Sequence, residues 1–181
     1  MNFPNIITLL RIAAAPFAVW LILEGLLLWA FWVFVIAGVS DALDGFVAKQ
    51  FDMETELGKF LDPIADKALL VSVYISLGIE GFIPNWLVIM VVFRDVAIVG
   101  GALLFETMTH SLTMHPLMVS KVNTTLQIVL AAAVMGSAGY EVELGGWLDA
   151  ALVLTAMATL LSGLSYAVVW AGSWSDLEDD K

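Results

Sequence analysis

Cysteine is absent from the sequence, which excludes disulfide bonds and thiolate metal sites. Positive charge is also scarce, because seven Lys and Arg stand against eighteen Asp and Glu and give a net charge of -11. We expect no nucleic-acid partner for so acidic a chain. What the sequence does contain in excess is apolar residues, at 61% of the chain with a mean hydropathy of +0.94. That content is far above the level of an ordinary soluble domain.

The apolar residues fall into stretches long enough to cross a membrane, for which about 20 residues are needed. Six stretches qualify, at residues 5–23, 26–46, 60–79, 84–105, 121–140 and 147–172. The first is too long and too weakly basic at its start for a cleaved signal peptide, so we expect it to remain as a span. The sequence therefore predicts an all-α polytopic membrane protein, a bundle of six transmembrane helices forming one domain over residues 1–175, with an acidic cytoplasmic tail over 176–181.

The few basic residues predict the orientation of this bundle. Cytoplasmic segments of membrane proteins are enriched in Lys and Arg. If the N-terminus is cytoplasmic, the connections around Glu24, Glu80 and residues 141–143 lie outside and contain no Lys or Arg in the sequence. The cytoplasmic side then carries Lys49, Lys59, Lys121 and Lys181. We predict an N-in, C-in protein of the cell (inner) membrane, with the connection between the second and third spans on the cytoplasmic side.

Aspartates interrupt the apolar sequence between residues 41 and 66, in two sets with helical spacing. The first set falls at i, i+3, i+4 and i+7, and the second at i, i+4 and i+8, so each set forms one stripe on a helix. The two sets are Asp41, Asp44, Gly45 and Ala48, and Gly58, Asp62 and Asp66. If the two helices pack with these stripes facing, the carboxylates converge on one acidic site with room for a ligand.

A single aspartate here has a simple structural explanation. Asp62 precedes Pro63, as an N-cap precedes proline in a first helical turn, and Asp41 and Asp44 could each end a span. Four carboxylates at these spacings favour a function instead, because ionisable residues at membrane depth are costly. Unpaired carboxylates repel one another, so the arrangement indicates a cage for hard divalent cations.

The same residues resemble the motif of the CDP-alcohol phosphatidyltransferase family, DxxDGxxAR followed after eight residues by GxxxDxxxD. One position departs, because Lys49 stands where the family has arginine and offers a point charge in place of a planar fork. A weaker likeness covers PNIITLLR at 4–11, IPNW at 83–86, FRD at 93–95 and SKVNTTLQ at 120–127.

The resemblance implies a homodimeric six-helix enzyme that moves a phosphatidyl group from CDP-diacylglycerol to an alcohol acceptor among membrane lipids and releases CMP. It implies two divalent ions, Mg²⁺ or Mn²⁺, as cofactors. By the same resemblance, Asp66 is the general base. The metal ligands are Asp41, Asp44 and Asp62, with a share for Asp66. The nucleotide and its diphosphate are bound by Asp44, Gly45, Ala48, Lys49 and Gly58.

Two further basic residues are expected to bind the acceptor's phosphate by this resemblance, Arg94 and Lys121. Arg94 lies inside an apolar run, so it either forms an internal ion pair or faces an anionic ligand. Lys67 follows Asp66 and points about 100° away from it on a helix, where it either snorkels to the interface or pairs with another acid.

Other polar residues carry weaker predictions. Asn5, Thr8 and Arg11 share a helix face and are possible headgroup contacts, although Arg11 could simply anchor the first span. His110 and His115 lack the spacing and acidic company of a metal site, and we interpret them as loop residues.

Short sequence segments limit the choice of acceptor to two alcohols. The opening PNIITLLR looks like that of phosphatidylglycerophosphate synthases, which use glycerol 3-phosphate, but those enzymes have GKxKT where this chain has Asn123 in place of the second lysine. FRD and SKVNTxLQ look like the cardiolipin synthases of the family, which use phosphatidylglycerol. We therefore predict phosphatidylglycerol as the acceptor and keep glycerol 3-phosphate as the alternative. A divalent-cation transporter is a remote alternative.

Overall fold

The structure is a computed structural model that describes the backbone of residues 3–50, 56–109 and 118–179, and the side chains of residues 12–40, 67–101 and 118–169. Within these ranges it consists of helices without strands. The helices are α1 (Phe3–Leu23), α2 (Leu27–Gln50), α3 (Glu56–Ile79), α4 (Asn85–Thr109), α5 (Met118–Gly139) and α6 (Gly146–Asp179). The predicted all-α class is therefore confirmed for the described residues.

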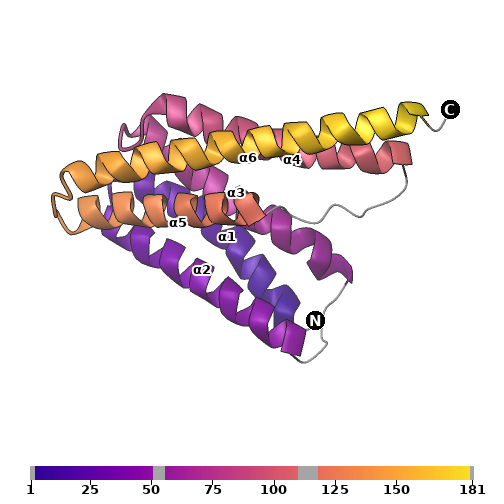
Figure 1. Ribbon diagram of the computed structural model, residues 1–181. Helices are drawn as coiled ribbons and strands as arrows, with labels where there is room; N and C mark the ends of the chain where they lie inside the picture. The colour runs from indigo at the N-terminus through magenta and orange to yellow at the C-terminus, as the bar shows by residue number, and fades with distance from the viewer. Residues whose placement is uncertain (1–2, 51–55, 110–117, 180–181) are drawn as a thin grey trace.

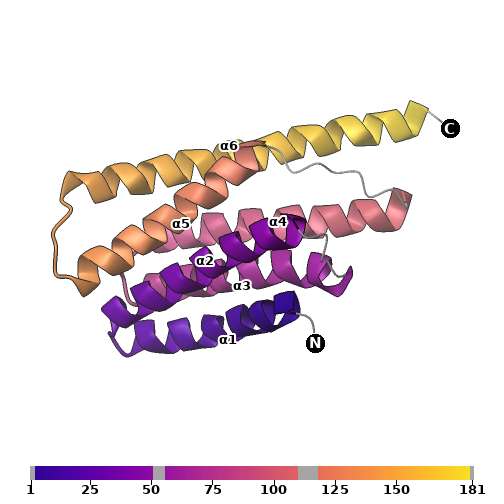
Figure 2. The same ribbon diagram turned by 90° about the horizontal axis from the view of Figure 1, so that it is seen from below.

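The helices form an elongated bundle in which both chain ends lie at the same end (Figures 1 and 2). We call this the terminal end and the opposite one the turn end. Helix α1 packs against α2 and α3, α4 against α3 and α6, and α5 against α2, α3 and α6. At the terminal end α2, α3 and α4 continue beyond the predicted apolar stretches, because a helix can run on into polar sequence where hydropathy no longer marks it.

Two helical segments of the described residues are long and apolar enough to cross a membrane, Met118–Gly139 and Gly146–Val169. Three others are apolar but shorter, Ile12–Leu23, Leu27–Ser40 and Lys67–Ile79. Large apolar side chains also face outward, among them Trp29, Phe93 and Val168, each more than 60% exposed. An outer surface of this kind suits lipid contact, whereas six spans and their orientation stay a prediction.

Small residues allow the helices to approach closely at the turn end. A Cβ atom added to Gly139 of α5 would lie 2.6 Å from the backbone nitrogen of Leu28 in α2, so only glycine fits there. Gly136, one turn earlier, lies against the ring of Phe31. Membrane helices commonly pack through small residues in this way, since lipid provides no hydrophobic drive for their association.

Three helices end in left-handed turns that satisfy their last carbonyls. At the end of α1, Gly25 has φ +73° and the amide of Leu26 donates to the carbonyl of Leu21 at 2.8 Å. Gly81 ends α3 with φ +77° in the same way. These are Schellman motifs, for which glycine is the usual residue. At the end of α5 the left-handed position is held by Glu141, with φ 55°.

Candidate active site

The aspartate motif lies on helical backbone at the terminal end of the bundle (Figure 1). Residues 41–50 belong to α2 and residues 56–66 to α3, so the helical spacing on which the prediction depends is present in the backbone. The motif side chains themselves lie outside the described side chains. This applies to Asp41, Asp44, Gly45, Ala48, Lys49, Gly58, Asp62 and Asp66, and equally to Asn5, Thr8 and Arg11.

The predicted facing of α2 and α3 is not found in the described part of the chain. There α2 contacts α1 and α5, α3 contacts α1, α4 and α5, and no direct contact joins α2 to α3. Convergence of the four carboxylates stays a prediction for the terminal ends of both helices. The described side chains contain no group of three or more His, Asp or Glu able to hold a metal ion. Carboxylate oxygens remain suitable donors for Mg²⁺ or Mn²⁺ by their chemistry.

A buried charged cluster lies next to the motif along α3. We call it the Arg94 cluster, and its members are Lys67, Arg94, Asp95, Ser120 and Ser162. The guanidinium of Arg94 donates through Nη1 to Asp95 Oδ1 at 2.6 Å and through Nη2 to the hydroxyls of Ser120, at 2.6 Å, and Ser162. Lys67 Nζ lies 2.9 Å from the same Asp95 oxygen. The cluster therefore joins α3, α4, α5 and α6.

Burial makes these contacts strong. The side chains of Arg94 and Asp95 are each 3% exposed, while that of Lys67 is 32% exposed. In such surroundings a charge without a partner would be expensive. Of the two alternatives for Arg94, the structure contains the internal ion pair, and of those for Lys67 it contains the pairing with an acid.

The charges of the cluster do not cancel among the described side chains. There two cations, Lys67 and Arg94, share the carboxylate of Asp95, which leaves one positive charge in excess in this part of the chain. Arg94 Nε and Asp95 Oδ2 are also buried without a hydrogen-bond partner in the described residues. An excess of positive charge in an apolar bundle suits an anionic ligand.

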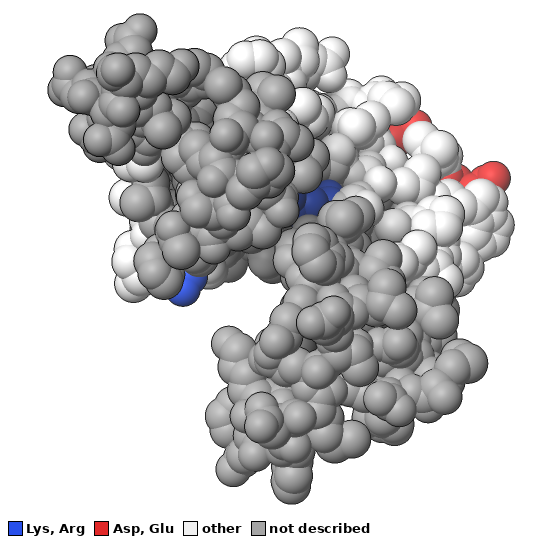
Figure 3. All heavy atoms as spheres, turned by 90° about the vertical axis from the view of Figure 1, so that its right-hand side faces the viewer, with Lys and Arg blue, Asp and Glu red and all other residues white. Residues whose placement is uncertain are grey.

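Lys121 stands apart from this cluster. It follows Ser120 near the start of α5, and its side chain is exposed. Figure 3 looks at the terminal end, where blue surface from described Lys and Arg side chains is visible. Exposure leaves Lys121 accessible to an anionic ligand.

A neutral polar network continues from the Arg94 cluster between α5 and α6, and it was not predicted from the sequence. The Thr159 hydroxyl lies 2.9 Å from Asn123 Oδ1 and accepts from Gln127 Nε2 at 3.4 Å. All three residues are at most 1% exposed. The signal was present as two polar stripes in apolar helices, at positions 120, 123 and 127 and at positions 155, 159 and 162.

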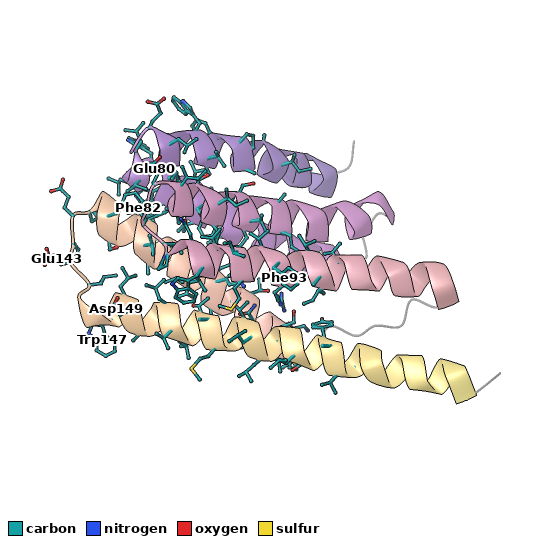
Figure 4. The ribbon with its side chains drawn as sticks, turned by 90° about the horizontal axis from the view of Figure 1, so that it is seen from above. Glu80, Phe82, Phe93, Glu143, Trp147 and Asp149 are labelled. Atoms are coloured by element: carbon teal, nitrogen blue, oxygen red, sulfur yellow. The ribbon has the colours of Figure 1, made fainter. Side chains whose placement is uncertain are left out.

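The turn end has a different character. Figure 4 labels Glu80, Glu143 and Asp149 there, together with Phe82 and Trp147, while Phe93 lies midway along α4. A cavity of about 540 Å³ opens at this end between Phe82 and the connection from α5 to α6. It is remote from the motif and the Arg94 cluster, so we do not assign it to the same site.

Comparison with known proteins agrees with the motif. The model of the family described as CDP-alcohol phosphatidyltransferase matches residues 1–171. Cardiolipin synthase (CMP-forming) of Rattus norvegicus is 34% identical over 91% of this chain and 60% of its own length. A chloroplastic CDP-diacylglycerol--glycerol-3-phosphate 3-phosphatidyltransferase of Oryza sativa is 31% identical over 93% and 56% of the respective lengths. The chain thus spans about three fifths of these two relatives. The Bacillus subtilis CDP-diacylglycerol--glycerol-3-phosphate 3-phosphatidyltransferase is 30% identical over 98% of this chain and 97% of its own length.

Proposed function

The chain belongs to the CDP-alcohol phosphatidyltransferase family, and on this basis we propose that it transfers a phosphatidyl group from CDP-diacylglycerol to an alcohol and releases CMP. The observation that carries the proposal is the complete set of motif aspartates on helical backbone at one end of the bundle. Family membership favours this transferase over a divalent-cation transporter.

The proposed acceptor is phosphatidylglycerol, which would make the protein a cardiolipin synthase. The rat relative with 34% identity supports this choice, as do the FRD and SKVNT segments. Glycerol 3-phosphate is the second candidate. It is supported by the Bacillus subtilis relative, which matches over 97% of its own length.

In the proposed mechanism the acceptor hydroxyl oxygen attacks the phosphatidyl phosphorus. The bond from this phosphorus to the CMP oxygen breaks, and Asp66 takes the proton of the hydroxyl. Two divalent ions, when bound, would neutralise the diphosphate and stabilise the departing CMP. The residues that would hold them are Asp41, Asp44, Asp62 and Asp66.

Other residues of the chain would bind and orient the substrates. Lys49 would bind the diphosphate, with Gly45, Ala48 and Gly58 leaving space for the nucleotide. Lys121 would contact the acceptor's phosphate from its exposed position. Arg94 would contribute its positive charge toward that phosphate from a buried position. The lipid headgroup would be contacted by Asn5, Thr8 and Arg11.

We further propose a homodimer of six-span protomers in the cell (inner) membrane, with both termini and the active site on the cytoplasmic side. The charge distribution supports this orientation. Glu24, Glu80 and Glu143 belong to the turn end, whereas Lys67, Arg94 and Lys121 lie further along the bundle toward the terminal end. Positive residues are typical of the cytoplasmic side.

The proposal is tested by CMP release from CDP-diacylglycerol in the presence of Mg²⁺ or Mn²⁺ and one acceptor at a time. Asp66→Asn should reduce the rate at least about 100-fold, since proton removal by a positioned base contributes that much or more. Asp149→Asn is the matched control, because Asp149 is an exposed aspartate at the turn end and its loss should leave the rate unchanged. An unchanged rate for Asp66→Asn would remove Asp66 from the mechanism.

The acceptor is tested by competition between phosphatidylglycerol and glycerol 3-phosphate in the same assay. We expect cardiolipin as the lipid product. Turnover of glycerol 3-phosphate alone would assign the second candidate. If CMP is released with neither of the two acceptors present in turn, both candidates are wrong.

A further inference from the structure

Lys67 is the first described side chain after the aspartate motif in α3, and it has one described acidic partner. Its Nζ lies 2.9 Å from Asp95 Oδ1 of α4. Because Lys67 directly follows Asp66 in the chain, this ion pair fixes α3 at the point where the motif ends. The position of Asp95 therefore bears on the position of the motif.

Asp95 is itself firmly held. Arg94 Nη1 donates to the same carboxylate oxygen, and Arg94 Nη2 donates to Ser120 of α5 and Ser162 of α6. Asp95 is 3% exposed, so water does not compete for these contacts. Through Asp95, Lys67 ties α3 to three other helices, α4, α5 and α6.

A second polar contact holds α3 on the same face. The hydroxyl of Tyr74, which is fully buried, donates to the backbone carbonyl of Gln127 in α5 at 3.0 Å. Tyr74 follows Lys67 by seven residues, about two helical turns, so both side chains leave α3 in nearly the same direction. Two contacts on one face oppose rotation of the helix about its axis.

Rotation is the movement to which the motif is most sensitive. A carboxylate about 5–6 Å from a helix axis moves about 1 Å for each 10° of rotation. Displacements of this size can lower catalytic rates by about 100-fold. A helix that carries metal ligands therefore needs a fixed rotation.

We infer that Asp95 is a positioning residue, which acts through Lys67 to fix the rotation of α3 and thereby the direction of the carboxylates at positions 62 and 66. The inference rests on the proposed function, because it assumes that these carboxylates bind metal. It gives Lys67 and Asp95 a role in metal binding without contact to the metal.

The test is Mn²⁺ binding to the full-length protein in detergent without substrate, measured by the electron paramagnetic resonance signal of free Mn²⁺. In Lys67→Met the Arg94–Asp95 pair stays intact while α3 loses its ion pair. Removing a cation beside the acidic site would strengthen Mn²⁺ binding by charge alone. Loss of positioning predicts the opposite, a Kd for Mn²⁺ raised about tenfold, as for residues that orient metal ligands elsewhere.

Two further variants separate positioning from charge and from folding. Lys181→Met removes an equal charge from the acidic tail, away from α3 in the sequence, and should not weaken Mn²⁺ binding. Lys67→Arg keeps a cation able to reach Asp95 and should bind Mn²⁺ within about threefold of the wild type. If Lys67→Met does not fold, Lys67→Gln replaces it with the same expected weakening.

The outcomes distinguish the inference from the proposed function. A wild-type protein that binds no Mn²⁺ overturns the proposed metal site and this inference with it. A wild type that binds Mn²⁺, with unchanged or tighter binding in the folded Lys67 variant, overturns the inference alone.

Discussion

Helices meet in two different ways in this protein. At the turn end α5 approaches α2 through Gly139, whose Cα leaves no space for a side chain against Leu28. Nearer the motif, α3, α4, α5 and α6 meet through Arg94, Asp95 and their partners. Close packing of glycine requires no buried charge, whereas an ion pair in an apolar bundle must offset a large desolvation cost. The costly contact is found beside the candidate active site, which suggests that it is retained for positioning rather than for stability alone.

The largest effect is expected from Asp95→Asn, which tests the charged side of the comparison. The substitution keeps the shape of the side chain but leaves Lys67 and Arg94 without a carboxylate. Breaking a buried ion pair in this way costs about 3–5 kcal/mol. Thermal unfolding in detergent measures the loss, and Asp149→Asn at the exposed turn end should change stability by less than about 0.5 kcal/mol. Similar stabilities of Asp95→Asn and Asp149→Asn would show that the Arg94 cluster does not stabilise the bundle.

Gly139→Ala tests the glycine side and should have the next largest effect. The added methyl group would lie 2.6 Å from Leu28 N and 2.7 Å from its Cα, so α2 and α5 must separate. Overpacking of this kind costs about 1–3 kcal/mol. Gly100→Ala is the matched control, because among the described residues no atom outside the adjoining backbone of α4 lies within 4 Å of the added methyl group, and alanine favours a helix interior. The same unfolding assay should show Gly100→Ala at or above the wild type, and a loss equal to that of Gly139→Ala would contradict the packing argument.

The sequence predicted well where the helices lie in the chain, and poorly which helices contact one another. Apolar stretches mark helices because lipid excludes unpaired backbone groups. They do not show which faces pack together, since a helix in lipid can be apolar all around. Hence the contact of α1 with α3 was not predictable, and the expected facing of α2 and α3 is not found among the described residues.

The residues of the candidate site were likewise predicted only in part. Charged residues in apolar runs stand out, so Arg94 and Lys67 were identified together with the possibility of internal ion pairs. Ser162 and Thr159 were missed, because hydroxyl groups are common in membrane helices and can bond to their own backbone. Only the combination of two helices shows that Ser162 meets Arg94.

Thr159→Val tests whether the neutral network contributes as much to the free energy of unfolding as the charged cluster or only as much as the glycine contact. The substitution preserves shape and leaves Asn123 and Gln127 without their shared hydroxyl. Hydrogen bonds between membrane helices average about 0.6 kcal/mol, so we expect a loss of about 1 kcal/mol for the two. Thr125→Val removes an exposed hydroxyl bonded within its own helix and is the control. A loss above about 3 kcal/mol for Thr159→Val would show that the network stabilises the bundle as strongly as the charged cluster does.

The smallest effect should come from the left-handed backbone at the end of α5. Glu141 has φ 55°, which an L-residue adopts at a cost and glycine does not. Glu141→Gly should therefore raise stability by about 0.5 kcal/mol, a gain reduced by the greater freedom of glycine in the unfolded chain. Gly81→Ala is the reciprocal variant, since Gly81 has φ +77° and open space around it. It should lower stability by about 1 kcal/mol in the same unfolding assay. If both substitutions shift stability in the same direction, left-handed geometry does not determine how these two helices end.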